Sequence, residues 1–161
     1  PEQGAAHMNR IVAGVVAAVV LSGCATVPQT PQEKILGVWT CAVVMGGLEG
    51  TSTMTYMPDG TATGPVTFVG ETDGVEIDLS GNVKSTWQFL DDGRLSETVR
   101  EFSVTTAKFD GDVMGPDLIA SMIQPMIAAG IQGQEAVTDV TFDGPTMTMS
   151  AQDAEPTICK R

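Results

Sequence analysis

The sequence predicts a mainly β fold, an antiparallel up-and-down β-barrel with one helix inserted around residues 116–130, and a β-sandwich is the alternative. Two observations support this prediction. Short runs rich in β-branched residues alternate with turn signals, and the 161-residue chain contains 18 Gly and 9 Pro, which commonly mark turns. Regularly spaced short strands of this kind are typical of barrels and sandwiches.

We predict nine strands, at residues 37–45, 51–57, 61–69, 74–79, 83–90, 94–108, 136–142, 145–151 and 156–160. The turns between them include Asp73-Gly74, Ser80-Gly81-Asn82 and Asp143-Gly144-Pro145. Asp-Gly between alternating runs is a strong hairpin signal, so neighbouring strands should pair antiparallel. Because closure by antiparallel pairs needs an even number of strands, one of the nine should be wrong or lie outside the barrel.

Residues 115–130 interrupt the strand pattern. Apolar side chains recur there at helical spacing, at Leu118, Ile119, Met122, Ile123, Met126 and Ile127. Pro116 suits a first helical turn and Gly130 suits the end, whereas Pro125 should kink the helix or split it near Ser121. The helix is expected to pack on the barrel wall or across one end, or else to form a mobile lid over a cavity.

The first residues of the chain have the features of an export signal. Met8-Asn9-Arg10 supplies a start and a positive charge, and residues 11–21 are an apolar run too short to span a bilayer. The run ends in Leu21-Ser22-Gly23-Cys24, which resembles the lipobox of bacterial lipoproteins. The resemblance implies that residues 8–23 are a signal peptide and that Cys24 is lipidated by acyl chains such as palmitate.

This resemblance also implies a place in the bacterial cell envelope. Two or more acyl chains give stable anchoring, and Ala25 after Cys24 favours the outer membrane, with the protein facing the periplasm. Residues 1–7 are interpreted as an upstream extension or a tag scar. Residues 24–33 are interpreted as an extended tether, because Pro28 and Pro31 should prevent it from forming a helix or strand. The folded domain is then expected at residues 34–161.

If Cys24 is lipidated, Cys41 and Cys159 remain. Two cysteines in an oxidising envelope compartment predict one disulfide. It would close a loop of about 118 residues, for which chain entropy gives a stabilisation of at most about 4–5 kcal/mol. The β-sandwich alternative would be closed by the same disulfide.

Gly37 and Trp39 open the first predicted strand, and this Gly-x-Trp resembles the signature of lipocalins and the wider calycin group. If Cys41 faces Cys159 in an antiparallel pair, Trp39 faces Arg161, and their side chains can form a cation–π contact within about 6 Å. An Arg over the first-strand Trp is a recurring feature of calycin barrels. Gly37, Trp39 and Arg161 are therefore the barrel signature, and their resemblance implies a lipocalin-like domain.

Charge and composition exclude several functions. A net charge of −12 repels phosphate backbones, so we expect no nucleic-acid partner. The single histidine, His7, precedes the predicted mature chain, which excludes Ser-His-Asp and Cys-His catalysis there. We predict neither an enzyme nor a bound metal or cofactor.

Methionine is unusually frequent, with nine in the chain. Thioether side chains fill irregular cores and adaptable apolar pockets. If a ligand pocket exists, we expect it to be lined by Met54, Tyr56, Trp87, Met122, Met126, Met147 and Met149.

Two functions remain open. In the first, a membrane-anchored lipocalin-like barrel binds or carries a small apolar ligand. In the second, a non-enzymatic interaction, inhibitor or structural protein meets a basic protein partner with its acidic surface. An interior cavity of roughly 300 Å³ or more would favour the ligand, and a filled interior would favour the partner.

Overall fold

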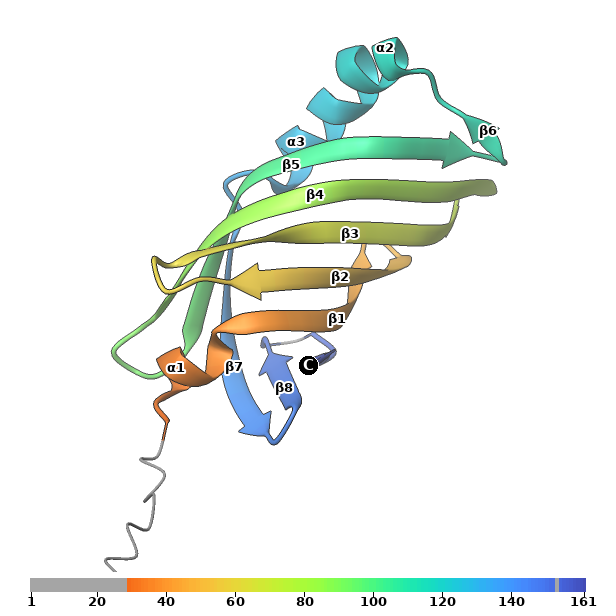
Figure 1. The fold of residues 1–161 in the computed structure, drawn as a ribbon. Helices are drawn as coiled ribbons and strands as arrows, with labels where there is room; N and C mark the ends of the chain where they lie inside the picture. Colours follow the sequence, from red (N-terminus) through yellow and green to blue (C-terminus); the bar gives the residue numbers. More distant parts are fainter. Residues whose placement is uncertain (1–28, 153) are drawn as a thin grey trace, which may run out of the picture.

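A computed structural model describes residues 29–152 and 154–161 (Figure 1). These residues form one antiparallel sheet of nine strands with a few short helices. The strands are β1 (Gly37–Met45), β2 (Leu48–Tyr56), β3 (Thr61–Thr72), β4 (Val75–Phe89), β5 (Leu95–Phe109), β6 (Asp112–Val113), β7 (Glu135–Asp143), β8 (Thr146–Ser150) and β9 (Thr157–Lys160). The mainly β prediction is confirmed, whereas the alternative of two separate sheets in a sandwich is not found.

Eight of the strands close into a ring in the order β1-β2-β3-β4-β5-β7-β8-β9, which we call the strand ring, and the two-residue β6 is added beside β5. The even number arises because residues 74–79 and 83–90, predicted as two strands, are the single strand β4. The predicted turn Ser80-Gly81-Asn82 is therefore wrong, because these residues lie inside β4.

The glycine that suggested this turn serves a different purpose. The pairing of β4 with β5 changes register between Ser80 and Gly81. A Cβ on Gly81 would lie 2.6 Å from the carbonyl oxygen of Ser103 and 2.9 Å from the ring of Phe102. Glycine is required because the neighbouring strand approaches too closely for a side chain. Glycine inside a strand often marks such a close approach of two backbones.

The first and last strands meet in the predicted register. Cys41 pairs with Cys159 and Thr40 with Lys160, and the predicted disulfide joins the two cysteines. The strand ring is closed over only part of its height, because β1 pairs with β9 through two residues and β5 pairs with β7 through residues 95–98. Beyond these pairs the long strands β3, β4 and β5 extend past β7, β8 and β9 (Figure 1).

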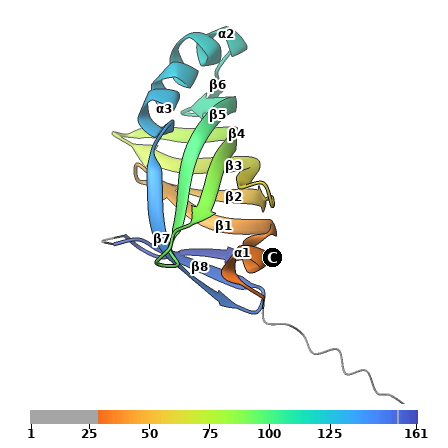
Figure 2. The same cartoon turned by 90° about the vertical axis from the view of Figure 1, so that its left-hand side faces the viewer.

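The helical segment packs along this extended part, beside β5 (Figure 2). It consists of α2 (Pro116–Leu118), a π-helical turn η1 (Ile119–Ile123) and α3 (Gln124–Ile131). The π turn contains Ser121 and ends two residues before Pro125, so the predicted irregularity near Ser121 is present. Ile123 is fully buried against the sheet, which confirms packing against the wall.

Glutamines of this segment cover the free edge of β5. Gln124 accepts a hydrogen bond from the backbone N–H of Val104 at 2.6 Å and donates to the carbonyl of Phe102 at 2.5 Å. Gln132 donates to the carbonyl of Arg100 at 2.6 Å. These contacts satisfy backbone groups that would otherwise leave an open strand edge available for pairing with another chain.

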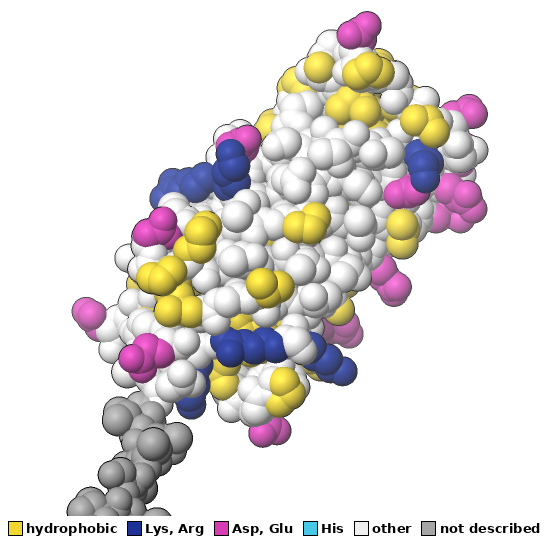
Figure 3. All heavy atoms as spheres, viewed as in Figure 1, with side chains coloured by type: hydrophobic (Ala, Val, Ile, Leu, Met, Phe, Trp, Pro, Cys, Tyr) yellow, Lys and Arg dark blue, Asp and Glu magenta, His cyan; other side chains and the backbone are white. Residues whose placement is uncertain are grey.

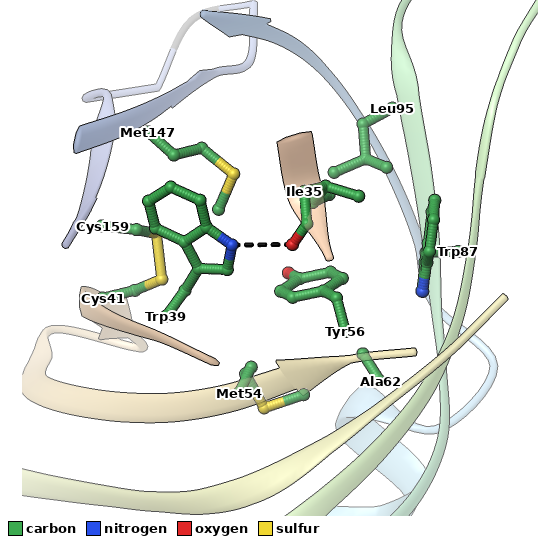
Figure 4. Close-up of a cluster of buried hydrophobic side chains, with 10 residues drawn as sticks. All are labelled: Ile35, Trp39, Cys41, Met54, Tyr56, Ala62, Trp87, Leu95, Met147 and Cys159. Carbon is green, nitrogen blue, oxygen red and sulfur yellow. Dashed lines mark hydrogen bonds between the residues drawn. A yellow bond between two sulfur atoms is a disulfide. The ribbon is translucent and has the colours of Figure 1, made fainter. Parts of the chain in front are cut away.

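Two clusters of buried side chains fill the interior. The lower cluster lies inside the closed part of the strand ring and contains Ile35, Trp39, Cys41, Met54, Tyr56, Ala62, Trp87, Leu95, Met147 and Cys159 (Figure 4). The upper cluster lies under the helical segment and contains Leu48, Val66, Phe68, Leu79, Phe102, Ala107 and Ile123. The candidate site lies in the space between these two clusters.

Part of the predicted tether is folded. Residues Pro31–Ile35 form the helix α1, with Thr30 and Glu33 exchanging the hydrogen bonds of a capping box. The prediction that Pro31 prevents a helix is wrong because proline is tolerated in the first helical turn, where its missing N–H would have no partner.

The predicted signal peptide, Cys24 and the first part of the tether lie outside the described residues. No helix within residues 29–152 and 154–161 is long and apolar enough to cross a membrane.

Candidate functional site

An apolar pocket of about 200 Å³ lies inside the strand ring, between the two clusters, and is open on one side. We call it the interior pocket. It is lined by side chains of six strands, namely Cys41, Val43, Ser52, Met54, Tyr56, Val66, Phe68, Val83, Glu97 and Met149. Most of this lining is apolar, and Glu97 is its only charged residue.

Glu97 is held in place by two hydroxyl groups. The phenol of Tyr56 on β2 donates to Oε2 of Glu97 at 3.0 Å, and the hydroxyl of Ser85 on β4 donates to Oε1 at 2.5 Å. Tyr56 and Ser85 are 3% and 2% exposed, so neither can turn to water. Because one carboxylate oxygen receives a donor from the adjacent strand β4 and the other from β2 across the ring, the orientation of Glu97 towards the interior pocket is fixed.

The charge of Glu97 is not neutralised by another side chain. Within the described residues, the three ion pairs of the protein involve Lys84, Arg94 and Lys108, and none includes Glu97. Burial and the nearby Glu97 raise the pKa of Tyr56 well above its usual value of 10.0. Tyr56 therefore stays neutral and acts as a hydrogen-bond donor at neutral pH.

The aromatic neighbours make the floor of the site rigid. Trp87 lies edge-on to Tyr56, with ring centroids 6.0 Å apart, and its indole N–H donates to the carbonyl of Thr61 at 2.9 Å. Figure 4 shows Trp87 beside Tyr56 within the lower cluster. Because packed aromatic rings have little freedom to rotate, the side chain of Tyr56 keeps one rotamer, and its phenol stays in contact with Glu97.

The seven residues predicted to line a ligand pocket occupy three different places. Met54, Tyr56 and Met149 line the interior pocket. Trp87 and Met147 are buried in the lower cluster and do not line it.

Met122 and Met126 are 56% and 63% exposed, so the prediction that they line a pocket is wrong. The helical segment has two apolar stripes, and Ile119, Ile123 and Ile127, rather than these methionines, pack against the sheet. Spacing alone could not distinguish the stripes, since both repeat at helical intervals.

Glu97 and Ser85 were not identified from the sequence, although a signal for them exists. Glu97 stands two residues after Leu95 and two before Val99, so it occupies the apolar face of its strand. Ser85 stands in the same way between Val83 and Trp87. A polar residue on the inward face of a strand that is otherwise apolar there is unusual, and this is the signal that could have identified Glu97 and Ser85.

The residues of the barrel signature close the lower end of the interior. The guanidinium of Arg161 lies 4.3 Å from the ring centroid of Trp39, within the predicted distance. Arg161 also donates to the carbonyls of Lys34 and Leu36, and the indole N–H of Trp39 donates to the carbonyl of Ile35 at 2.7 Å. Together they fix α1 under the ring. Gly37 begins β1 with a φ of 107°, a conformation that favours glycine.

A larger hollow of about 670 Å³ lies on the outer face of β3, β4, β5 and β6. Its charged lining is already paired in part, because Lys108 and Asp78 form an ion pair at 2.7 Å. The charged residues that line this hollow are exposed, as Glu71 and Glu76 are, or only half-buried, as Asp78 and Lys108 are. The interior pocket is therefore the better candidate site, although it is smaller.

The surface carries dispersed acidic side chains and an apolar area at the helical end (Figure 3). Leu118, Met122 and Met126 contribute to the exposed apolar side chains there. Both acidic and basic side chains are visible on this face.

No model of a known protein family matches the chain, and no curated protein is significantly similar to it.

Proposed function

We propose that this protein is a lipid-anchored bacterial envelope lipoprotein whose lipocalin-like β-barrel binds a small apolar ligand. The observation that carries the proposal is the interior pocket, an apolar space inside a ring of antiparallel strands with one oriented polar group. Binding sites for small molecules typically combine a concave, mostly apolar wall with a few placed polar groups. The contact of Arg161 with Trp39, two of the signature residues, supports the lipocalin-like assignment, since it is the contact that this resemblance implies.

The size of the interior pocket limits the ligand. Its volume of about 200 Å³ is below the roughly 300 Å³ that was expected from the sequence to favour a ligand, so volume alone does not favour a ligand of ordinary size. An apolar cavity of about 150 Å³ is sufficient to hold benzene. The proposed ligand is therefore the size of one substituted aromatic ring, or a short branched alkyl group, rather than a long-chain fatty acid.

The alternative function, interaction of the acidic surface with a basic protein partner, predicts an interior that serves only as a scaffold. The oriented carboxylate of Glu97 favours the ligand, because a protein that served only as a scaffold would gain nothing from an unpaired charge on the wall of its pocket. Anchoring to the envelope rests on the lipobox resemblance at Cys24 and is part of the same proposal.

The proposal is tested by blocking the interior pocket. Val43 and Val44 are neighbours on β1, but Val43 lines the interior pocket whereas Val44 is 71% exposed. Val43→Trp should fill the space and abolish binding of benzene-sized ligands, measured by calorimetry and by native mass spectrometry of protein extracted from the producing cell. Val44→Trp adds the same side chain to the outside and should bind as the wild type does.

Two results would reject ligand binding. One is a wild-type protein that retains no small molecule after extraction and binds none of the probes. The other is equal binding by the Val43→Trp and Val44→Trp variants, because it would place the bound molecule elsewhere.

A further inference from the structure

We infer that Glu97 makes the interior pocket selective for small apolar molecules that carry a protonated amine. The inference rests on the proposed ligand-binding function and specifies its ligand class.

The hydrogen-bonding capacity of Glu97 is only partly used. An ionised carboxylate offers about four acceptor positions on its two oxygens. Tyr56 and Ser85 each fill one of them, one on either oxygen. The remaining positions can accept hydrogen bonds from a ligand in the interior pocket, which Glu97 lines.

Both protein partners of Glu97 are donors that cannot exchange roles. The raised pKa of Tyr56 keeps its proton on the phenol, and the hydroxyl proton of Ser85 is committed to Oε1 at 2.5 Å. The polar end of the interior pocket therefore presents acceptors. A ligand has to supply donors, and an ammonium group supplies three of them.

Charge favours an ammonium group over a neutral donor. A carboxylate that is partly removed from water is costly unless an opposite charge approaches it, and within the described residues no Lys or Arg forms an ion pair with Glu97. A ligand cation would provide this partner. The net charge of −12 on the chain adds a general attraction for cations.

The same arrangement rejects anionic ligands. A carboxylate headgroup would face Glu97 without a cation between them, and like charges at close range are unfavourable. Apart from the hydroxyls of Ser52 and Tyr56, the rest of the wall, including Val66, Phe68 and Val83, offers apolar contact. These features together specify an amine headgroup on an apolar body of about one ring.

The test uses three probes of one shape and different charge, namely benzylamine, benzyl alcohol and benzoate, with the full-length protein in isothermal titration calorimetry. Benzylamine should bind about 10- to 100-fold more tightly than benzyl alcohol, since hydrogen bonds to charged groups exceed neutral ones by this range. Benzoate should not bind measurably.

Glu97→Gln removes the charge and keeps one acceptor oxygen, while its amide NH2 replaces the oxygen that accepted from the other hydroxyl of the Tyr56 and Ser85 pair. It should reduce the preference for benzylamine over benzyl alcohol to less than about threefold. Glu101→Gln is the matched control, because Glu101 lies on the same strand and is exposed, where it pairs with Lys84. This control removes one negative charge from the protein and should leave the preference unchanged.

The outcomes separate the inference from the proposed function. Equal binding of benzylamine and benzyl alcohol by the wild type would overturn the amine selectivity and leave apolar ligand binding intact. Failure of all three probes to bind would overturn both. The comparison of probes on the wild type decides the matter even if the Glu97→Gln variant does not fold.

Discussion

Replacing Arg161 with alanine should destabilise the protein by removing the contacts that join its C-terminal end to α1. The side chain lies over Trp39 and donates hydrogen bonds to the carbonyls of Lys34 and Leu36. The backbone N–H of Arg161 donates to the carbonyl of Pro145 at 3.0 Å. The substitution leaves this backbone contact intact, so the effect should come from the side chain.

The expected magnitude follows from these contacts. A cation–π contact at an exposed site contributes about 0.5–1 kcal/mol. Each of the two hydrogen bonds adds about 0.5–1 kcal/mol, at the lower end of the usual range because Arg161 is exposed. Arg161→Ala should therefore lower the free energy of unfolding by about 1.5–3 kcal/mol.

Urea unfolding followed by circular dichroism measures this change. Lys160→Ala, at the neighbouring exposed position of β9, is the control and should change the free energy of unfolding by less than about 0.5 kcal/mol. Arg161→Lys keeps the charge but loses the planar donor group, so it should fall between the wild type and Arg161→Ala.

The disulfide provides a second check on the reasoning. Chain ends fray unless they are fixed, and the bond between Cys41 and Cys159 fixes the strand that precedes Arg161. In the reduced protein the effect of Arg161→Ala should be largely lost. An Arg161→Ala variant as stable as the wild type, or an undiminished effect after reduction, would refute the assignment of Arg161 to this role.

Three further predictions concern separate parts of the protein. Cys41→Ser and Cys159→Ser should each lower the free energy of unfolding by about 2–5 kcal/mol, and the double variant should be no less stable than either; finding both thiols free by mass mapping would contradict this. The pKa of Tyr56 is raised in the folded state by burial and by Glu97, so the stability that this shift contributes is fully present below about pH 10 and is lost as the pH rises through the folded pKa. Because Tyr56 is the only tyrosine, phenolate absorbance reports it alone, and it should appear together with loss of the folded circular-dichroism signal rather than before it. Cys24→Ser should leave the protein unanchored or unprocessed, and a variant that still fractionates with membranes in acylated form would reject the lipobox assignment.

The sequence by itself determined the features that depend on local chemistry. Asp-Gly pairs placed several hairpins correctly, and β1 begins and ends where the alternation predicted, at Gly37 and Met45. The predicted antiparallel pairing of Cys41 with Cys159 correctly placed Arg161 over Trp39, because one known pair of residues fixes the register of two antiparallel strands.

Glycine and proline show where local chemistry was insufficient. Gly81 suggested a turn, but the close approach of β5 requires a glycine inside a strand. Pro31 suggested an extended tether, but it occupies the first turn of a capped helix. The same residue type suits both environments, and only its neighbours in space determine which one is present.

The candidate site itself depended on the tertiary structure. Glu97, Tyr56 and Ser85 come from three strands, and no spacing along the chain brings their side chains together. Met122 and Met126 were predicted to face inward, yet the alternative apolar stripe packs on the sheet. Periodicity specifies which residues share a face of an element, whereas the packing of elements against one another decides which face becomes the interior.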